Sequence, residues 1–147
     1  MNELLFYTDG SCIGNPGPGG WAFLYLNDAK VIYEASGSEL NTTNNRMEMM
    51  AAIEALSYAA KNNYKNITVC TDSKYVMDGI SSWITKWKSN SWKTAAKKPV
   101  KNMDLWKVLD SLNLSMNVNW NWVKGHSEDL FNNRVDELAN LAAQKAL

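Results

Sequence analysis

The chain has 147 residues, of which 46% are hydrophobic and 20% charged, and its formal net charge at pH 7 is zero. These proportions exclude a disordered or collagen-like protein and predict a single domain spanning residues 1–147. No apolar run reaches the length of a membrane span, and the N-terminal residues lack the pattern of a leader peptide. We therefore expect a cytoplasmic protein without a membrane partner, whose two cysteines, Cys12 and Cys70, are reduced.

Charge is unevenly distributed along the chain. Residues 1–73 carry 4 basic and 8 acidic side chains, residues 74–124 carry 9 and 3, and residues 125–147 carry 2 and 4. Residues 83–101 contain six lysines and three tryptophans but no acidic side chain. Lysine binds phosphate as a point charge and aromatic rings stack on bases, so this stretch favours contact with nucleic acid. A solvated lysine-rich helix is the alternative.

The first forty residues predict three short strands. Apolar and aromatic runs occur at residues 4–8, 21–26 and 31–37, and turn signals separate them. Residues 14–20, between the first two runs, contain four glycines and two prolines. Such a segment predicts a tight loop that leads into the second strand.

The rest of the chain alternates helices with strands. A helix is predicted from Thr43 to about residues 62–63, with Asn44 or Asn45 available as its N-cap. The later segments predict a buried strand, a helical region, a helix, a strand and a closing amphipathic helix at, respectively, residues 67–71, from 73, 104–114, 118–123 and 135–146. Hairpin strands followed by such alternation predict an α/β domain with a mixed sheet covered by helices.

Four carboxylates stand in positions where they need a partner. Asp9 and Asp72 each follow an apolar run and a threonine, Glu48 lies among methionines, and Asp136 lies on the last helix. Each has an ordinary alternative: a turn residue, a helix N-cap, a capping box with Asn45, and a solvated helix face, respectively. If all four converged, their oxygens would suit Mg²⁺ or Mn²⁺ and not zinc.

The single histidine, His126, lies in a predicted loop between a strand and a helix. Because its imidazole titrates near neutrality, it is a candidate proton shuttle. An ordinary surface histidine is the alternative.

Four motifs in order connect the chain to a known family. They are TDGSC at 8–12 with GNPG at 14–17, TTNNRME at 42–48, TDS at 71–73, and WVKGH at 122–126 followed by NRVDELA at 133–139. With these motifs the chain closely resembles ribonuclease HI, the bacterial style of type 1 ribonuclease H, over residues 3–143. The resemblance implies the ribonuclease H-like α/β fold, a five-stranded mixed sheet in order 3-2-1-4-5 flanked by helices, with a basic protrusion at residues 82–101.

The resemblance also implies an activity and a catalytic site. The family hydrolyses the RNA strand of RNA–DNA hybrids and leaves 5′-phosphate and 3′-hydroxyl ends, and a free-standing, monomeric enzyme is implied here. Its metal-binding carboxylates match Asp9, Glu48, Asp72 and Asp136, which would hold two Mg²⁺ ions, with Mn²⁺ as a substitute. Its mobile catalytic histidine matches His126.

The family's substrate-binding positions fall into groups. Those that meet the RNA strand match Cys12, Asn15, Asn44 and Asn45. Those that form a pocket for a DNA phosphate match Thr43 and Asn102, and those that form walls of the DNA groove match Trp83 and Trp106. Those on the basic protrusion match Lys86, Lys88, Lys93, Lys97, Lys98 and Lys101.

The chain departs from the family pattern at two places. Lys74 stands where the pattern often has glutamine, which would change an RNA contact into a phosphate contact. The protrusion carries less charge than the usual run of basic residues.

Two other functions remain to be distinguished from hybrid hydrolysis. A non-catalytic hybrid-binding module would have lost a metal carboxylate, whereas all four are present. A resolvase or integrase core on the same fold would lack the asparagine-rich loop and the basic protrusion.

Overall fold

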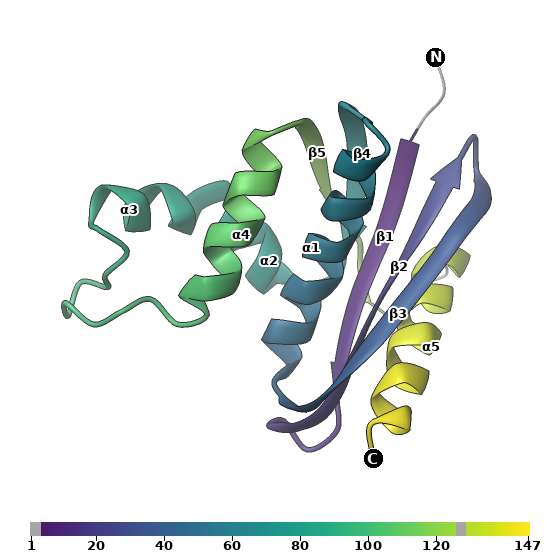
Figure 1. Ribbon diagram of the computed structural model, residues 1–147, viewed down its shortest axis with the longest axis horizontal. Helices are drawn as coiled ribbons and strands as arrows, with labels where there is room; N and C mark the ends of the chain where they lie inside the picture. Colours follow the sequence, from purple (N-terminus) through teal and green to yellow (C-terminus); the bar gives the residue numbers. More distant parts are fainter. Residues whose placement is uncertain (1–3, 126–128) are drawn as a thin grey trace.

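A five-stranded mixed sheet forms the centre of the computed structural model, which describes residues 4–125 and 129–147 (Figure 1). Its strands are β1 (Leu4–Cys12), β2 (Gly17–Asn27), β3 (Lys30–Thr42), β4 (Asn66–Thr71) and β5 (Asn117–Trp122). The first three strands pair antiparallel, and β4 and β5 join them in parallel. The order β3-β2-β1-β4-β5 confirms the predicted topology.

Helices cover both faces of the sheet. The longer ones are α1 (Asn44–Lys61), α4 (Met103–Leu114) and α5 (Leu130–Lys145). Between β4 and α4 lie α2 (Lys74–Asp78), a π-helical turn (Gly79–Trp83) and α3 (Ile84–Ser89). Figure 1 shows α1 and α4 on one face, α5 on the other, and α3 with its following loop projecting away from the sheet.

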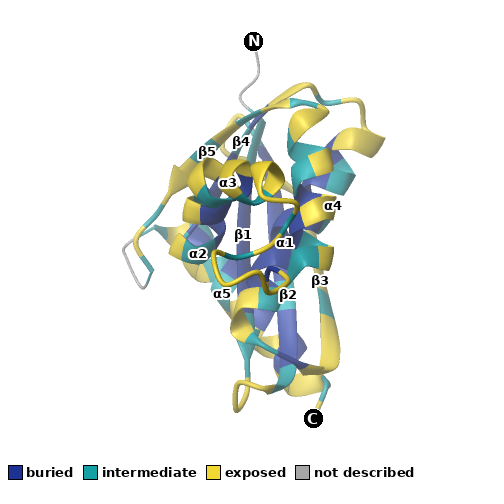
Figure 2. Cartoon of the chain, turned by 90° about the vertical axis from the view of Figure 1, so that its left-hand side faces the viewer, coloured by how far each residue is buried: buried dark blue, intermediate teal, exposed yellow. Residues whose placement is uncertain are grey.

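The core lies on both sides of the two central strands because successive side chains of a strand point to opposite faces. Phe6, Phe23 and Tyr25 belong to the cluster that includes α1 and α4, whereas Tyr7 and Leu24 belong to the cluster with α5. Figure 2 shows β1 and β2 as buried and β3, an edge strand, as mostly exposed. In the part of the chain that is described, no helix combines the length and apolarity needed to cross a membrane.

Strand β2 begins earlier than the sequence predicts. The expected loop at residues 14–20 is wrong from Gly17 onward, because β2 starts there and Cys12 of β1 pairs with Gly19. Pro18 is accommodated at an irregularity in the pairing with β3. Gly20 is required where α5 crosses the strand, because a Cβ at this position would collide with the backbone at Ala139.

Two helix starts use caps other than the predicted ones. The N-cap of α1 is Thr43, whose hydroxyl accepts the Arg46 N–H at 3.3 Å, and not Asn44 or Asn45. The N-cap of α2 is Ser73, whose hydroxyl accepts the Val76 N–H at 3.1 Å. The carboxylates with alternative capping roles in the sequence are therefore left for other contacts.

Candidate active site

Three carboxylates from three elements meet beside the central strands. Asp9 lies in β1, Glu48 in the second turn of α1 and Asp72 directly after β4. Each places one oxygen within 4.8 Å of the others. Asp9 and Asp72 come together because β1 and β4 are parallel neighbours with Thr8 opposite Thr71, so that the two Thr-Asp pairs are in register.

Close approach of α1 to β1 brings Glu48 to this place. A Cβ at Gly10 would collide with the backbone of Met47 and Glu48. Only glycine therefore allows the helix to lie against the strand at the residue that follows Asp9. Glu48 is itself buried, and its carboxyl lies next to those of Asp9 and Asp72.

The fourth predicted carboxylate reaches the cluster from the opposite face of the sheet. Asp136 is half-buried on α5, and its carboxyl interacts with that of Asp9, whose pKa it helps to raise. It lies outside the set of three whose oxygens share the 4.8 Å limit. The fold thus gathers Asp9, Glu48 and Asp72 closely and brings Asp136 next to Asp9.

Burial and the repulsion of neighbouring carboxylates raise the pKa values of Asp9 and Glu48. The side chains of Asp9 and Glu48 are only 3% and 6% exposed. Burial first, and then the charge of Asp72, raise the pKa of Asp9 to about 8. Burial, together with the charges of Asp9 and Asp72, raises the pKa of Glu48 well above its usual value.

Two oxygens of the cluster lack hydrogen-bond donors. Asp9 Oδ1 accepts the Gly10 N–H at 2.9 Å, but neither Asp9 Oδ2 nor Glu48 Oε1 meets a donor among the described residues. A buried acceptor left in this way costs roughly 1–3 kcal/mol. A divalent cation would satisfy both oxygens, and an all-oxygen donor set suits Mg²⁺ or Mn²⁺. The residues present therefore fit such an ion.

The predicted catalytic histidine, His126, lies outside the described residues. The residue before it, Gly125, passes beside the cluster, because a Cβ built on it would lie 3.1 Å from Asp72 Oδ2.

A pocket next to the start of α1 collects six of the predicted substrate-binding residues. Asn15, Thr43, Asn44, Asn45, Lys101 and Asn102 line it together with Pro16. They come from the β1–β2 connection, the first turn of α1 and the segment before α4. The Asn44 N–H donates to Asn15 Oδ1 at 2.8 Å, which ties two of these segments together. Cys12 lies near them, half-buried, with its thiol directed to the carbonyl oxygens of Gly17 and Thr42.

Sequence analysis missed the side chains that hold this pocket. Arg46 donates to both carboxylate oxygens of Asp104, at 3.0 and 2.8 Å, and to Asn102 Oδ1 at 3.2 Å. Asn102 has a left-handed backbone, with φ of 61°, and donates to the Tyr75 hydroxyl at 3.0 Å. Arg46 and Asp104 are 58 positions apart, so no local pattern indicates their pairing.

The two predicted groove tryptophans differ in depth. Trp83 is half-buried and packs edge-on against Tyr75 with ring centroids 5.6 Å apart. Trp106 is 0% exposed and its indole donates to the Tyr75 hydroxyl at 3.3 Å. The prediction that Trp106 forms a wall of the groove is therefore wrong. Gly79 packs directly against the Trp106 ring, and Trp106 therefore supports the aromatic cluster from the interior.

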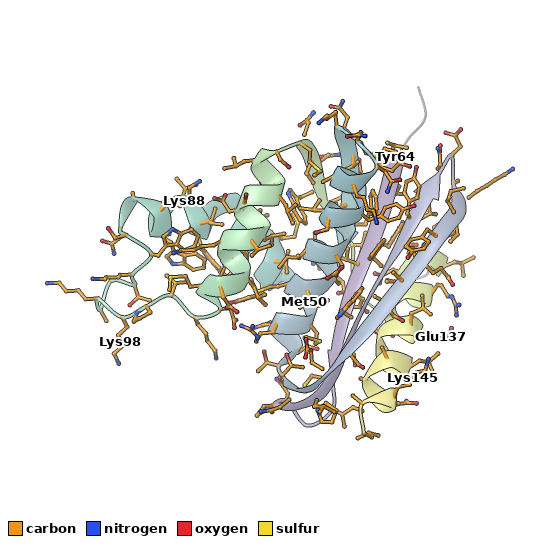
Figure 3. The ribbon with its side chains drawn as sticks, in the orientation of Figure 1. Met50, Tyr64, Lys88, Lys98, Glu137 and Lys145 are labelled. Carbon is orange, nitrogen blue, oxygen red and sulfur yellow. The ribbon has the colours of Figure 1, made fainter. Side chains whose placement is uncertain are left out.

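The lysines of the lysine-rich segment are exposed, and one of them forms an ion pair. Lys88 forms an ion pair of 3.0 Å with Asp110 on α4, so this lysine does have an acidic partner, which the sequence stretch itself lacks. The other predicted lysines of the segment are exposed: Lys86, Lys93, Lys97, Lys98 and Lys101. Figure 3 shows Lys88 and Lys98 on the projecting segment, far from the sheet.

Lys74 follows Asp72 by two residues, and its side chain lies beside an aromatic ring. It is exposed on α2, and its ammonium lies 5.0 Å from the ring centroid of Trp122, at the end of β5. Among the described residues, Cys12 and Cys70 take part in no disulfide.

Comparison with known proteins connects this arrangement to a family. The RNase H family model matches residues 1–144. Ribonuclease H of Hydrogenovibrio crunogenus is 58% identical over 142 residues, which cover 97% of this chain and 96% of that protein.

Solved structures agree with the family match. LC9-RNase H1, a type 1 RNase H with the type 2 active-site motif, superposes with a TM-score of 0.88 at 29% identity, over 100% of this chain and 74% of that one. LC11-RNase H1, solved in complex with an RNA/DNA hybrid, shares the fold with a TM-score of 0.71 at 24% identity, over 98% of this chain and 99% of that one. With nearly every residue inside the family match, the chain belongs to the ribonuclease H family of endoribonucleases.

Proposed function

We propose that this protein hydrolyses the RNA strand of RNA–DNA hybrids at the site formed by Asp9, Glu48, Asp72 and Asp136. The reaction uses two Mg²⁺ ions and leaves 5′-phosphate and 3′-hydroxyl ends. The observation that carries the proposal is the convergence of Asp9, Glu48 and Asp72 within 4.8 Å, from three separate elements. A non-catalytic hybrid-binding module has no need for such a costly cluster of buried carboxylates.

The four carboxylates would hold the ions, and the unpartnered oxygens of Asp9 and Glu48 support this role. Two bound divalent ions supply an activated water and stabilise the leaving 3′-oxygen. The chain keeps Asp9 and Glu48 shielded from solvent and leaves Asp72 and Asp136 half-buried, so the cluster is accessible through these two residues. Mn²⁺, which also prefers oxygen ligands, would replace Mg²⁺.

Substrate selection is assigned to the pocket beside α1. Asn15, Asn44 and Asn45 can both donate to and accept from a 2′-hydroxyl, which distinguishes RNA from DNA. Thr43 and Asn102 would bind a phosphate of the DNA strand, with Trp83 beside them. LC11-RNase H1, which shares the fold, binds an RNA/DNA hybrid in its solved structure, and this supports the same substrate here.

Three further parts of the proposal concern residues around the catalytic cluster. His126 would act as the proton shuttle, for which an imidazole is suited near neutral pH. Cys12 would contribute through the backbone to contact with the RNA strand. The exposed lysines of the projecting segment would bind the DNA backbone, and the protein would act as a monomer.

Replacing Asp9 with asparagine tests the proposal. Loss of a residue that only supports a metal ligand costs about 10- to 100-fold, so Asp9→Asn is expected to lower kcat by more than about 100-fold. Hybrid affinity should stay near that of the wild type because this carboxylate does not bind the duplex. The measurement is cleavage of matched RNA–DNA, RNA–RNA and DNA–DNA duplexes with Mg²⁺ and with a chelator, with end-group analysis of the products.

Asp78→Asn is the matched control, because Asp78 is an exposed aspartate on α2. This variant should cleave the hybrid as fast as the wild type. Near wild-type cleavage by Asp9→Asn would contradict the proposed site, and cleavage of all three duplexes at similar rates would contradict the proposed substrate. Hybrid binding by the wild type without cleavage would favour the non-catalytic module.

A further inference from the structure

We propose that Trp122 is a positioning residue that contacts a member of the catalytic cluster, Asp72, and a cation close to it in sequence, Lys74. Its indole N–H holds the backbone of Asp72, and its ring face holds the ammonium of Lys74, which would bind a phosphate of the RNA strand next to the metal site. This inference rests on the proposed function, because it takes Asp72 as a metal ligand and an RNA–DNA hybrid as substrate.

The first contact fixes the backbone at a place where the sheet no longer does so. Trp122 is the last residue of β5 and pairs with Thr71, the last residue of β4. The Val123 N–H still donates to the Thr71 carbonyl at 2.9 Å. Beyond this point the ladder ends, and the Asp72 carbonyl accepts instead from Trp122 Nε1 at 3.1 Å. A side chain thus replaces a ladder hydrogen bond at the residue that carries the carboxylate.

The second contact holds a cation on the face of the same indole that contacts Asp72. Lys74 Nζ lies 5.0 Å from the ring centroid of Trp122, within the range of about 6 Å for a cation–π interaction. In the parts of the chain that the structure covers, no carboxylate forms an ion pair with Lys74. The lysine is exposed and the tryptophan is 41% exposed, so the ammonium is open to a ligand.

Electrostatics explains why a cation is needed here. The cluster of Asp9, Glu48 and Asp72 is acidic, and an incoming phosphodiester is negatively charged. Like charges repel, so a cation on the indole that contacts Asp72 lowers the barrier to approach. Lys74 is two residues from Asp72 in sequence, and its contact with the indole ring restricts its side-chain rotamers. This restriction reduces the rotamer entropy that Lys74 loses when it binds phosphate.

Four variants separate the two contacts. Trp122→Phe removes the indole N–H and keeps an aromatic ring, Trp122→Leu removes both, and Lys74→Gln removes the cation. Trp120→Phe is the control: Trp120 lies two residues earlier on β5, and its indole donates to Asn113 Oδ1 at 2.9 Å, away from the cluster. It therefore measures the cost of losing an indole hydrogen bond on the same strand.

Two measurements distinguish positioning from structural support: the Mg²⁺ affinity of the protein without substrate, by titration calorimetry or thermal melting, and the kcat and KM for hybrid. Trp122→Phe should weaken Mg²⁺ affinity by about 10-fold, the lower end for a contact that supports a metal ligand. Its KM should stay close to the wild-type value. Lys74→Gln should raise KM by about 10-fold, the lower end for one hydrogen bond to a charged group, and should not weaken Mg²⁺ affinity. Trp122→Leu should show both effects, and Trp120→Phe neither.

The inference is overturned if Trp122→Phe and Trp120→Phe have equal Mg²⁺ affinity, or if Lys74→Gln leaves KM unchanged. Asp72→Asn, measured in parallel, reports on the proposed function itself. If Asp72→Asn still binds Mg²⁺ and cleaves hybrid, the assignment of the metal site fails. If it does neither while Trp122→Phe behaves like its control, only the inference about Trp122 fails.

Discussion

At the scale of single residues, the asparagines at the start of α1 link the fold to the proposed choice of substrate. Asn44 and Asn45 are exposed in the first turn, while Asn15 from the β1–β2 connection accepts the Asn44 N–H. The backbone of Asn44 is therefore anchored, and the two amides on the helix are free to meet a ligand. Their position is set by the Thr43 cap, which starts the helix one residue before them.

We predict that Asn44→Ala and Asn45→Ala each weaken RNA–DNA hybrid binding by about 5-fold, because each removes a hydrogen bond to a 2′-hydroxyl worth about 1 kcal/mol. Binding to a DNA duplex of the same sequence should change less. Equilibrium binding in chelator, where cleavage is suppressed, provides the measurement. Asn119→Ala, an exposed asparagine on β5, is the control and should affect neither duplex. Equal losses on both duplexes would show that these residues do not select RNA.

At the scale of elements, α3 and the loop that follows it form a lysine-bearing surface on an aromatic base. Trp87 packs against Trp92 and Trp106, with ring centroids 6.3 and 5.5 Å away. The tryptophans that the sequence suggests for stacking on bases are thus half-buried among one another, whereas the lysines point outward. Charge, and not stacking, is the property this element offers to a duplex.

Replacing Lys86, Lys93 and Lys97 together with alanine should flatten the dependence of hybrid affinity on salt. Each lysine that neutralises a phosphate contributes about 0.9 to the slope of log affinity against log salt, so the expected change is about 2 to 3. KM should rise while kcat at saturating hybrid holds, because these contacts are equal in ground and transition states. Salt titration of affinity and saturation kinetics measure both effects.

The control for these lysines removes the same charge elsewhere. Lys30, Lys61 and Lys145 lie on β3, α1 and α5, and their triple alanine variant should leave the slope nearly unchanged. If both triple variants flatten the slope equally, net charge and not the projecting segment controls binding. Lys88 is excluded from the test because its ion pair with Asp110 also links α3 to α4.

At the scale of the whole molecule, the carboxylate cluster joins β1, α1, the end of β4 and α5, and its charge acts on the stability of the entire fold. The pKa of Asp9, raised to about 8, and that of Glu48 are higher in the folded protein than in the unfolded chain. Between the unfolded-state pKa and the folded-state pKa of each group, the folded protein therefore binds more protons than the unfolded chain. The contribution of these two groups to the stability of the metal-free protein is therefore greatest below a pH of about 4. That contribution is lost as the pH rises towards 8.

Asp9→Asn removes that titration while keeping the shape of the side chain. In chelator at pH 8 the variant is expected to melt about 4 °C above the wild type, which corresponds to about 1 kcal/mol for a domain of this size. At pH 5 the difference should shrink, because the wild-type carboxyl is then protonated. Thermal melts at both pH values give the comparison, with Asp78→Asn as the control that shows no change.

Mg²⁺ should reverse the order of stability. A ligand that binds only the folded state raises its melting temperature, so the ion should stabilise the wild type at pH 8 more than it stabilises Asp9→Asn. If Asp9→Asn melts below the wild type at both pH values in chelator, the Asp9 carboxylate does not destabilise the metal-free fold, and the prediction is wrong.

The sequence by itself determined the parts of this protein that depend on neighbours along the chain. Period-two and period-3.6 patterns located the strands and helices, and the Thr-Asp pairs marked Asp9 and Asp72 where buried strands carry an acid. The order of the motifs then indicated the family. Local rules failed at Gly17, where the glycines serve close packing against other elements and not a loop, and at the cap of α1, where several side chains could compete.

Only the tertiary structure decided which distant side chains share a surface and how deep each lies. It brought Glu48 to Asp9 through the missing side chain of Gly10, paired Lys88 with Asp110, and buried Trp106 completely. Spacing along the chain carries none of this information, because contact and burial depend on which helix face meets which sheet face and at what distance. The two buried oxygens without a donor, on which the proposed cation site rests, exist for the same reason: folding removes water from carboxylates that are far apart in the sequence.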